Sequence, residues 1–288
     1  MDDLVGLGKL GESLVDAVTK AIGVIYEPTH IKRIGKAKAE ADAYTLIRQD
    51  GVKSEIEARA RARELHTSLR EQHNTETVLS LALEKLPVNS LSHSDISEDW
   101  LIYFFDLAKK QSSADIQRIW ATLLSAETQR PGSISKRTLA ALTAMERRDA
   151  NKFAELSTFR WTINNTALIV IPQTLIDYKI DYECLKHLDD IGAATFFKTL
   201  ADFKIKTQSN LIIGYDTKRV LLRPSQKSEI LIGCVQLSSI GNELLPLMPN
   251  SVNNEIFELT LDYWKQSGHG VDILPMNIPM PQAVHNSN

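Results

Sequence analysis

The sequence has 288 residues, of which 43% are hydrophobic and 24% are charged. This composition is typical of a globular chain with one large domain or two ordinary ones, and it excludes a largely disordered protein. The formal net charge of −3 gives no overall field that would require a nucleic-acid or membrane partner. Two cysteines cannot form a disulfide framework, so we expect Cys184 and Cys234 to be reduced core thiols.

The N-terminal segment predicts an amphipathic helix over residues 4–25. Apolar residues recur there at spacings of three or four, and charged residues interrupt them every few positions. A signal peptide or a membrane-spanning helix would need a longer uninterrupted apolar run. We therefore predict no transmembrane span and a cytoplasmic protein.

Several cations follow this helix in the sequence, and we expect the helix and the cations to form one contact surface. The helix and the cations together favour contact with a second protomer or with an anionic membrane surface. The polar face of the helix itself is neutral, which favours protein packing over the membrane. A peripheral position on the inner membrane stays open as the alternative. The predicted contact residues are Leu7, Leu14, Val18, Lys32, Arg33, Lys36 and Lys38.

The first half of the chain predicts helices throughout. Residues 1–73 combine the amphipathic helix with helices rich in Ala, Lys, Arg and Glu, whose mixed charges are typical of a solvated face. Residues 74–157 predict a compact helical module. Trp100 and Trp120 lie on apolar stripes of this module, so we expect both in its core.

Polar residues and glycines mark where several of these helices begin and end. Ser97, Ser135 and Asp181 each precede a periodic run and are predicted to be N-terminal caps. Pro131-Gly132 predicts a tight turn, and Gly192 predicts the end of the helix that Asp181 begins.

The last third of the chain changes character. Strand-like runs lie between two helical segments, and the first two runs are separated by a hairpin tip. The order helix, hairpin, helix predicts a small α+β, winged-helix-like unit over residues 158–268. Residues 269–288 are predicted to be an extended or disordered tail, and the whole fold is predicted to be mainly α. The three strand-like runs are residues 211–215, 220–223 and 229–233.

A winged-helix-like unit raises the question of nucleic-acid binding. The helix that begins at Asp181 carries four acidic residues against Lys186 alone, and it would repel phosphate. The hairpin is better placed because it carries several cations. The candidate nucleic-acid contacts are Lys218, Arg219, Arg223 and Lys227.

Motifs that carry catalysis are not found in this sequence. We find no phosphate-binding loop, no zinc-protease motif and no nucleophile elbow. His187 beside Asp189 is a loose pair of a kind that occurs by chance. We therefore predict no catalytic residue, no metal ligand and no cofactor, although a catalytic site assembled from distant residues stays open.

Two blocks of the sequence resemble a known family. IGVIYEPTHIKRIGKAKAEA at 22–41 and DWLIYFFDLAKKQSSADIQRIWATLLSAETQRPGSISKRTL at 99–139 resemble the bacterial domain-of-unknown-function family 2806. The last third resembles it only in outline. The central block is also similar to a helix of the abortive-infection alpha proteins. The residues that carry this second similarity are Trp120, Ala121, Leu123, Leu124, Pro131, Gly132 and Ser133.

The resemblance implies a place among phage-defence or mobile-element-linked genes, and it supplies no catalytic residues. Our first hypothesis is therefore a non-enzymatic interaction protein that acts in phage defence as a homo-oligomer, with or without a further protein partner. Two alternatives stay open. One is a nucleic-acid-binding regulator that uses the C-terminal unit, and the other is a hydrolase or nuclease effector with a site that the sequence does not reveal.

Overall fold

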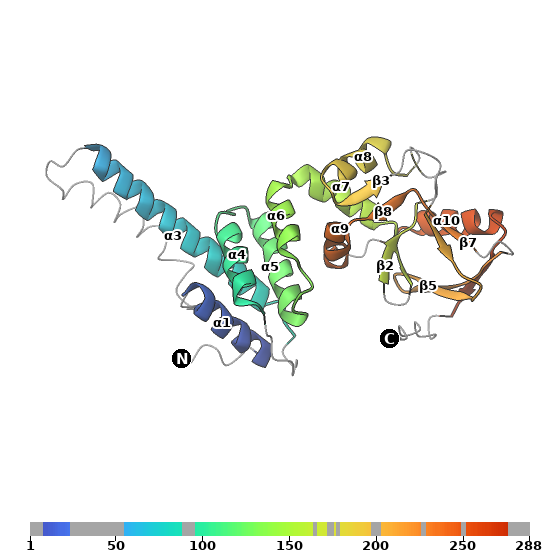
Figure 1. The fold of residues 1–288 in the computed structure, drawn as a ribbon, viewed down its shortest axis with the longest axis horizontal. Coiled ribbons are helices and arrows are strands. Elements are labelled where there is room, and N and C mark those ends of the chain that lie inside the picture. Colours follow the sequence, from blue (N-terminus) through green and yellow to red (C-terminus); the bar gives the residue numbers. More distant parts are fainter. Residues whose placement is uncertain are drawn as a thin grey trace. The chain divides into compact units, whose positions relative to one another are not determined.

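The computed structural model describes residues 8–23, 55–87, 96–163, 166–171, 176, 179–196, 203–225, 229–248 and 252–275. The chain divides into two compact units, residues 1–139 and 140–288. The first is helical, and the second combines helices with antiparallel sheets (Figure 1). The mainly α fold class is thus confirmed in outline, although the sheets are more extensive than the three predicted runs.

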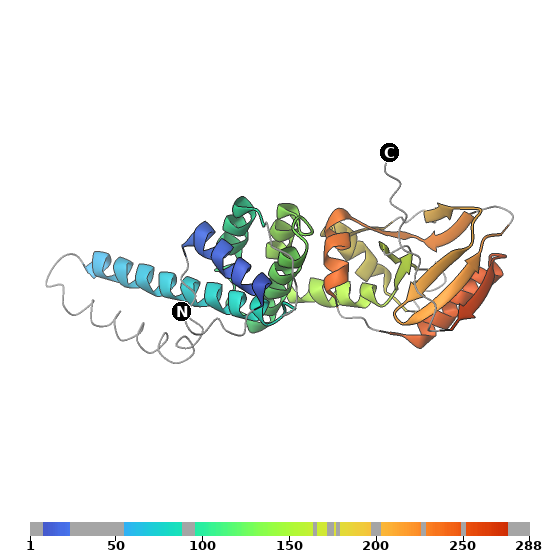
Figure 2. The ribbon, with the colours of Figure 1, turned by 90° about the horizontal axis from the view of Figure 1, so that it is seen from below.

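Within the described residues, unit 1 contains four helices and part of a fifth. α3 packs along α5, and α1 packs against α4 with a smaller contact to α5 (Figure 1, Figure 2). α6 spans the division between the units. The helices are α1 (Lys9–Ile22), α3 (Glu55–Leu83), α4 (Glu98–Ala108), α5 (Ala114–Gln129) and α6 (Lys136–Ala144).

α1 confirms the predicted amphipathic helix, and its apolar stripe packs into the core of unit 1. Leu10, Leu14 and Val18 are fully buried within the single chain. The burial of each side chain contributes about 1.5–3 kcal/mol before entropy is counted. The helix ends at Gly23, which is left-handed with φ 68°. Leu14 and Val18 are therefore core residues of unit 1 within the single chain.

The aromatic core of unit 1 joins α4 to α5. Trp100 stacks on Phe104 with ring centroids 5.0 Å apart, and Phe104 meets Trp120 edge-on at 5.2 Å. The Trp100 Nε1 donates a hydrogen bond to the Ile134 carbonyl oxygen at 2.7 Å. The prediction that both tryptophans are core residues is confirmed.

α3 continues through the boundary that we predicted between residues 73 and 74. Asn74 is buried there, and its side-chain amide donates to the Lys109 carbonyl oxygen (2.8 Å) and to the Ser112 Oγ (3.1 Å). Gln117 from α5 donates in turn to the Asn74 Oδ1 at 3.1 Å. These side-chain amides satisfy a partly buried carbonyl oxygen after α4 and so link α3 to the α4–α5 connection.

The described part of unit 2 contains one five-stranded antiparallel sheet and two two-stranded ones. The large sheet has the order β2-β1-β5-β6-β9, while β3 pairs with β8 and β4 with β7. The strands of the large sheet are β1 (Arg160–Ile163), β2 (Thr166–Ile169), β5 (Leu211–Tyr215), β6 (Lys218–Arg223) and β9 (Gly270–Leu274). The other strands are β3 (Ala194–Phe196), β4 (Phe203–Lys206), β7 (Glu229–Gly233) and β8 (Val235–Leu237). The helices are α7 (Arg147–Ser157), α8 (Tyr182–Asp190), α9 (Ser239–Leu244), the 3-10 helix η2 (Leu245–Leu247) and α10 (Asn254–Gln266).

The core of unit 2 lies between the large sheet and α10 (Figure 2). Trp161 from β1 stacks on Phe257 at 5.7 Å and meets Trp264 edge-on at 4.9 Å. The Tyr215 hydroxyl donates to the Thr158 carbonyl oxygen at 2.8 Å and accepts from the Asn253 amide at 3.1 Å. This hydroxyl therefore links the end of α7 to the start of α10.

The predicted strands are confirmed, but their arrangement differs from the one that we expected. β5 and β6 form the predicted hairpin, yet they lie inside the five-stranded sheet. β7 occupies the third predicted run and pairs with β4 instead of the hairpin. In a winged helix the hairpin flanks the recognition helix. A winged-helix-like unit is therefore not confirmed.

Part of the predicted tail belongs to the sheet. Residues 270–274 form β9, which pairs with β6. His269, directly before β9, is buried, and its Nδ1 accepts a hydrogen bond from the Ser225 amide at 2.9 Å. Burial lowers the pKa of His269. The rest of the tail, residues 276–288, lies outside the described residues.

The predicted cap residues stand where the sequence placed them. The Asp181 carboxylate accepts from the Glu183 amide at 3.0 Å and begins α8. The Ser135 hydroxyl accepts from the Thr138 amide at 3.3 Å. Ser97 is the N-terminal cap of α4, although its side chain makes no capping hydrogen bond.

Candidate functional site

The predicted nucleic-acid contacts on β6 point to two faces of the sheet. Successive side chains of a strand alternate between its faces. Lys218 lies over the Phe257 ring of α10, with its Nζ 4.0 Å from the ring centroid, and it also donates to the Asn254 Oδ1 at 2.8 Å. Arg219 and Arg223 are on the opposite face. The three cations therefore do not form one phosphate-binding surface.

The two arginines of β6 already have partners within the chain. The Arg219 Nη1 donates to the carbonyl oxygens of Asp216 (2.7 Å) and Lys218 (3.0 Å). Arg223 forms an ion pair with Asp272 of β9. Lys227 lies outside the described residues. A phosphate at Arg223 would compete with the Asp272 carboxylate.

A histidine–carboxylate pair joins α7 to α8. The His187 Nε2 is hydrogen-bonded to the Asp149 Oδ1, and the Asp149 Oδ2 accepts from the Glu146 amide at 2.6 Å. The sequence had suggested only the neighbouring Asp189 as a partner for His187. The capping-box spacing of Glu146 and Asp149 was a usable signal for the start of α7. Nothing local in the sequence indicated that Asp149 would meet His187.

The surroundings of this pair favour a structural role over nucleophilic catalysis. Burial opposes ionisation of the Asp149 carboxyl, but the hydrogen bonds from His187 and from the Glu146 amide leave its pKa below the usual value. Burial, with the nearby Glu155 carboxylate, raises the pKa of the Cys184 thiol to about 11. Cys184 therefore stays a thiol at neutral pH, and thiolate is the nucleophilic form.

We expect Asp149→Asn to lower the free energy of unfolding by about 1–3 kcal/mol at neutral pH, because a buried hydrogen-bonded carboxylate is lost. A folded-state pKa below the unfolded value stabilises the protein above the unfolded pKa. This stabilisation disappears as the pH falls through the folded pKa. Urea unfolding of wild type and variant should thus converge in acid. Asp189→Asn, at an exposed position of α8, is the control, and an equal loss in both variants would contradict the prediction.

A buried carboxylate that the sequence analysis missed organises the block that carries the family resemblance. Glu127 in the last turn of α5 is 2% exposed. Its Oε1 accepts from the Gly132 amide at 2.6 Å, and its Oε2 accepts from the Ile134 amide at 2.8 Å. Gly132 is left-handed with φ 84°, which confirms the predicted turn. Glu127 thus accepts the hydrogen bonds of the amides in the turn, and this part of the block has a structural role.

The described residues offer neither a metal site nor a membrane span. No three His, Cys, Asp or Glu side chains among them converge as a metal ion would require. No helix in the described ranges combines the length and the apolar character needed to cross a bilayer. Four of the predicted contact residues, Lys32, Arg33, Lys36 and Lys38, lie outside the described residues, as does Leu7.

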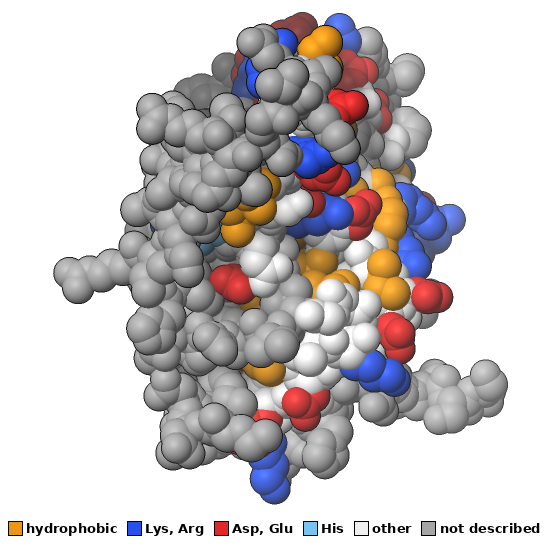
Figure 3. Space-filling view, turned by 90° about the vertical axis from the view of Figure 1, so that its left-hand side faces the viewer, with side chains coloured by type: hydrophobic (Ala, Val, Ile, Leu, Met, Phe, Trp, Pro, Cys, Tyr) orange, Lys and Arg blue, Asp and Glu red, His pale blue; other side chains and the backbone are white. Residues whose placement is uncertain are grey.

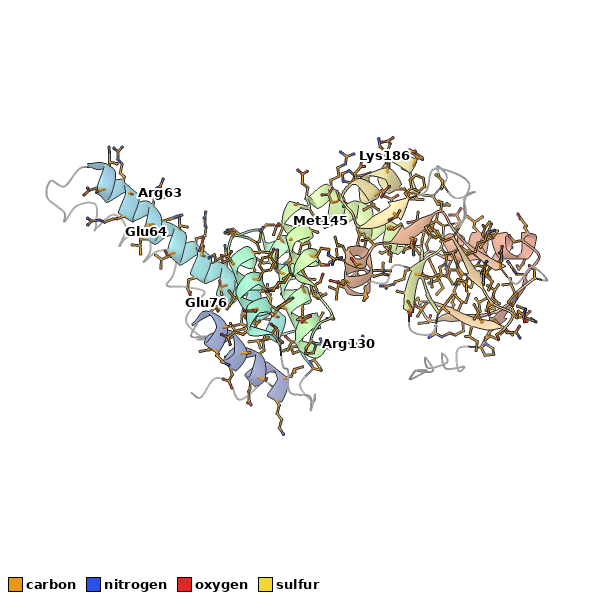
Figure 4. All side chains as sticks on the ribbon, viewed as in Figure 1. Arg63, Glu64, Glu76, Arg130, Met145 and Lys186 are labelled. Carbon is orange, nitrogen blue, oxygen red and sulfur yellow. The ribbon has the colours of Figure 1, made fainter. Side chains whose placement is uncertain are left out.

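The first part of α3 is the candidate interaction surface of unit 1. We call residues 55–73 the α3 arm; at 1.5 Å per residue it is about 28 Å long. Buried residues of α3 begin only at Asn74, within the side chains that the structure describes. The arm extends beyond α4 and α5 and carries Arg63 and Glu64 (Figure 4). Viewed toward this end of the molecule, the described acidic and basic side chains are interspersed with hydrophobic ones (Figure 3).

Fold and surface together define a protein with a helical unit, a mixed α/β unit and a projecting helical arm. The model of the family described as a protein of unknown function, DUF2806, matches residues 58–260. This is more than half of the chain, so the chain belongs to that family, as the sequence resemblance implied. The first resembling block, residues 22–41, lies outside the match. No curated protein and no solved structure matches the chain.

Proposed function

We propose that this protein is a non-enzymatic interaction protein that self-associates through the α3 arm and acts in phage defence. The observation that supports self-association is the seam of apolar residues along the arm. Ala58, Ala62, Leu65 and Leu69 follow one another at spacings of four, three and four residues. Helices that pair in coiled coils carry apolar residues at these spacings.

The seam is accessible and has a shape that suits helix pairing. Ala58, Ala62 and Leu65 are partly exposed, and Leu69 is 36% exposed. Small residues at the start of the seam allow two helix backbones to approach closely, and the two leucines supply apolar area. The rest of α3 is fixed against α5, so the arm loses little freedom when it binds.

We expect the wild-type chain to form an oligomer at micromolar concentration and Leu69→Glu to dissociate it toward the 32.3 kDa monomer. In a two-fold dimer the substitution is present in both chains. The free energy of association should therefore fall by about 3 kcal/mol, and the dissociation constant should rise roughly 100-fold. Size-exclusion chromatography with light scattering measures this directly.

Ile56 provides a matched control on the same arm. It is 71% exposed but lies on the face opposite the seam, two residues before Ala58. Ile56→Glu should therefore leave the oligomer intact. A wild-type chain that is strictly monomeric, or a Leu69→Glu oligomer of unchanged mass, would rule out the proposed seam.

The defence role rests on the sequence resemblance alone, in which the central block resembles a helix of the abortive-infection alpha proteins. The same block has a structural account, since Trp120, Leu123 and Leu124 are core residues. Bacteria that express the chain should show a lower efficiency of phage plating than cells with an empty vector. Leu69→Glu should abolish the protection, while Ile56→Glu should retain it. Equal plating on all four strains would argue against the defence role.

A further inference from the structure

β9 lies at one edge of the large sheet, and each of its side chains is partly or fully exposed. Ile273, at its centre, is 57% exposed. The strand is held by its backbone pairing with β6 and by the ion pair between Arg223 and Asp272. An ion pair between exposed side chains contributes less than about 1 kcal/mol. A strand with so few buried contacts belongs to the part of a domain that opens most readily.

His269 is the buried side chain that anchors the start of β9. It directly precedes the strand and is 6% exposed. Its backbone amide donates to the Trp264 carbonyl oxygen of α10 at 3.0 Å. Its Nδ1 accepts from the Ser225 amide at 2.9 Å, just beyond the end of β6. His269 therefore joins the end of α10, the end of β6 and the start of β9.

This anchor works only while the imidazole is neutral. A neutral ring that accepts at Nδ1 carries its proton on Nε2. A second proton, taken up at Nδ1, would make that nitrogen a donor that faces the Ser225 amide, which is also a donor. The hydrogen bond would be lost, and a charged ring would occupy a buried position, which is unfavourable. In agreement, burial lowers the pKa of His269 from its ordinary value of 6.5.

The charged groups on the adjoining elements are arranged in pairs of opposite sign. β6 and α10 both contact β9. Arg223 at the end of β6 pairs with Asp272 of β9, and Lys265 in the last turn of α10 pairs with Asp262. Both carboxylates thus have a cation as a partner. A protonated His269 would have to compete with those cations to gain an ion pair of its own.

We propose that His269 is an acid-sensitive anchor, and that protonation of its Nδ1 by solvent detaches β9 from the edge of the large sheet while the other strands stay paired. Detachment uncovers the edge of β6, where Val220 and Leu222 are fully buried opposite β9. Unit 2 then presents an apolar surface below neutral pH that it does not present above it. This inference concerns unit 2 and is independent of the α3 arm.

The direction of the pH dependence follows from the two states of His269. In the detached strand the ring is exposed to water and has its ordinary pKa of 6.5, whereas burial lowers this pKa in the attached strand. Detachment is therefore accompanied by the uptake of one proton between the two pKa values. The attached strand is most stable above pH 6.5. Below it, the equilibrium constant for opening should rise about tenfold per pH unit until the lower pKa is reached.

Hydrogen–deuterium exchange of the full chain, followed by mass spectrometry, tests the proposal. Exchange is compared at about pH 7.5 and about pH 5.5, on either side of the ordinary histidine pKa, and corrected for the intrinsic rate at each pH. We expect residues 270–274 to be about tenfold less protected at the lower pH, while β1 and β5 keep their protection. Equal protection of β9 at both pH values, or an equal loss in all of these strands, would overturn the proposal.

Two substitutions at position 269 separate the proton from the hydrogen bond. In His269→Asn the side-chain amide oxygen can accept from the Ser225 amide, but the side chain takes up no proton in this pH range. β9 should then stay protected at both pH values. His269→Ala removes the acceptor, so β9 should be poorly protected at both. Acid-dependent loss of protection in His269→Asn that equals that of wild type would refute the role of His269.

His187 supplies the control for a second titrating group in unit 2. It is hydrogen-bonded to Asp149 between α7 and α8. In His187→Asn the acid response of residues 270–274 should persist. Its disappearance in this variant would assign the response to the α7–α8 pair and count against His269.

The wild-type chain gives a further test that needs no substitution. Protection of residues 270–274 is followed across the pH range, and we expect it to begin to fall near pH 6.5. A loss that begins only near pH ~4, where carboxylates take up protons, would assign the detachment to the ion pair of Arg223 with Asp272. That outcome would overturn the proposal.

Discussion

Gly233→Ala is expected to destabilise unit 2 by at least ~3 kcal/mol, because strain at a special backbone position and a steric clash act together. Gly233 ends β7 with φ 121°, a conformation that other residues rarely adopt. An added Cβ would lie 1.9 Å from the Ile171 carbonyl oxygen. Ile171 forms a parallel bridge with Gly233, and its amide donates to the Ile232 carbonyl oxygen at 3.1 Å. The clash is therefore with backbone, which cannot rotate away.

Thermal unfolding followed by circular dichroism measures this effect. A loss of 3 kcal/mol corresponds to a fall in melting temperature of roughly 6–12 °C for a unit of this size. Gly192→Ala is the matched control, since Gly192 also has a positive φ of 73° but an added Cβ would meet nothing within 4 Å. It should cost only about 1–2 kcal/mol. Equal melting temperatures for the two variants would show that the close approach of residue 171 does not cause the loss of stability.

Glu127→Ala is expected to lower the free energy of unfolding of unit 1 by about 2–5 kcal/mol. The variant leaves the amides of the exposed Gly132 and the buried Ile134 without their acceptor, and a hydrogen bond to a charged group contributes about 1.5–3 kcal/mol. The damage should reach the aromatic core, because the Ile134 carbonyl oxygen holds the Trp100 indole. We therefore expect a change in tryptophan fluorescence together with the loss of stability in urea.

Two further variants separate the buried carboxylate from charge in general. Asp115→Asn removes an exposed acid from the same helix, where it pairs with Arg118, and should cost less than about 1 kcal/mol. Glu127→Gln keeps one acceptor oxygen and should lie between wild type and Glu127→Ala. Glu127→Ala with no greater loss than Asp115→Asn would show that the turn does not depend on this anchor.

The structure shows which neighbours the residues of the two predicted surfaces have. The apolar stripe of α1 was identified correctly, and it packs on α4 and α5. The cations of β6 were also identified correctly. They lie on two faces of the sheet, with Lys218 over Phe257 on one face and Arg223 beside Asp272 on the other. Sequence showed which residues were apolar or charged, while the neighbours decided what those residues could contact.

Local order along the chain was determined by the sequence itself. Apolar periodicity and caps such as Asp181 and Gly192 located α8, and the hairpin of β5 and β6 followed from two apolar runs with a short polar tip. These signals act between residues only a few positions apart, so no knowledge of the rest of the fold was needed. The family was visible for the same reason, since its central block is a contiguous stretch.

Pairing between distant residues was decided only by the tertiary structure. His187 meets Asp149, Ile171 meets Gly233, and β9 extends the sheet from what looked like a tail. Each of these contacts depends on how whole elements pack, because a hydrogen bond or a close approach requires a particular neighbour and not merely a suitable residue type. The sequence by itself therefore determined the helices, the hairpin and the family, while burial and long-range packing determined which of its charged and apolar residues remain available for a partner.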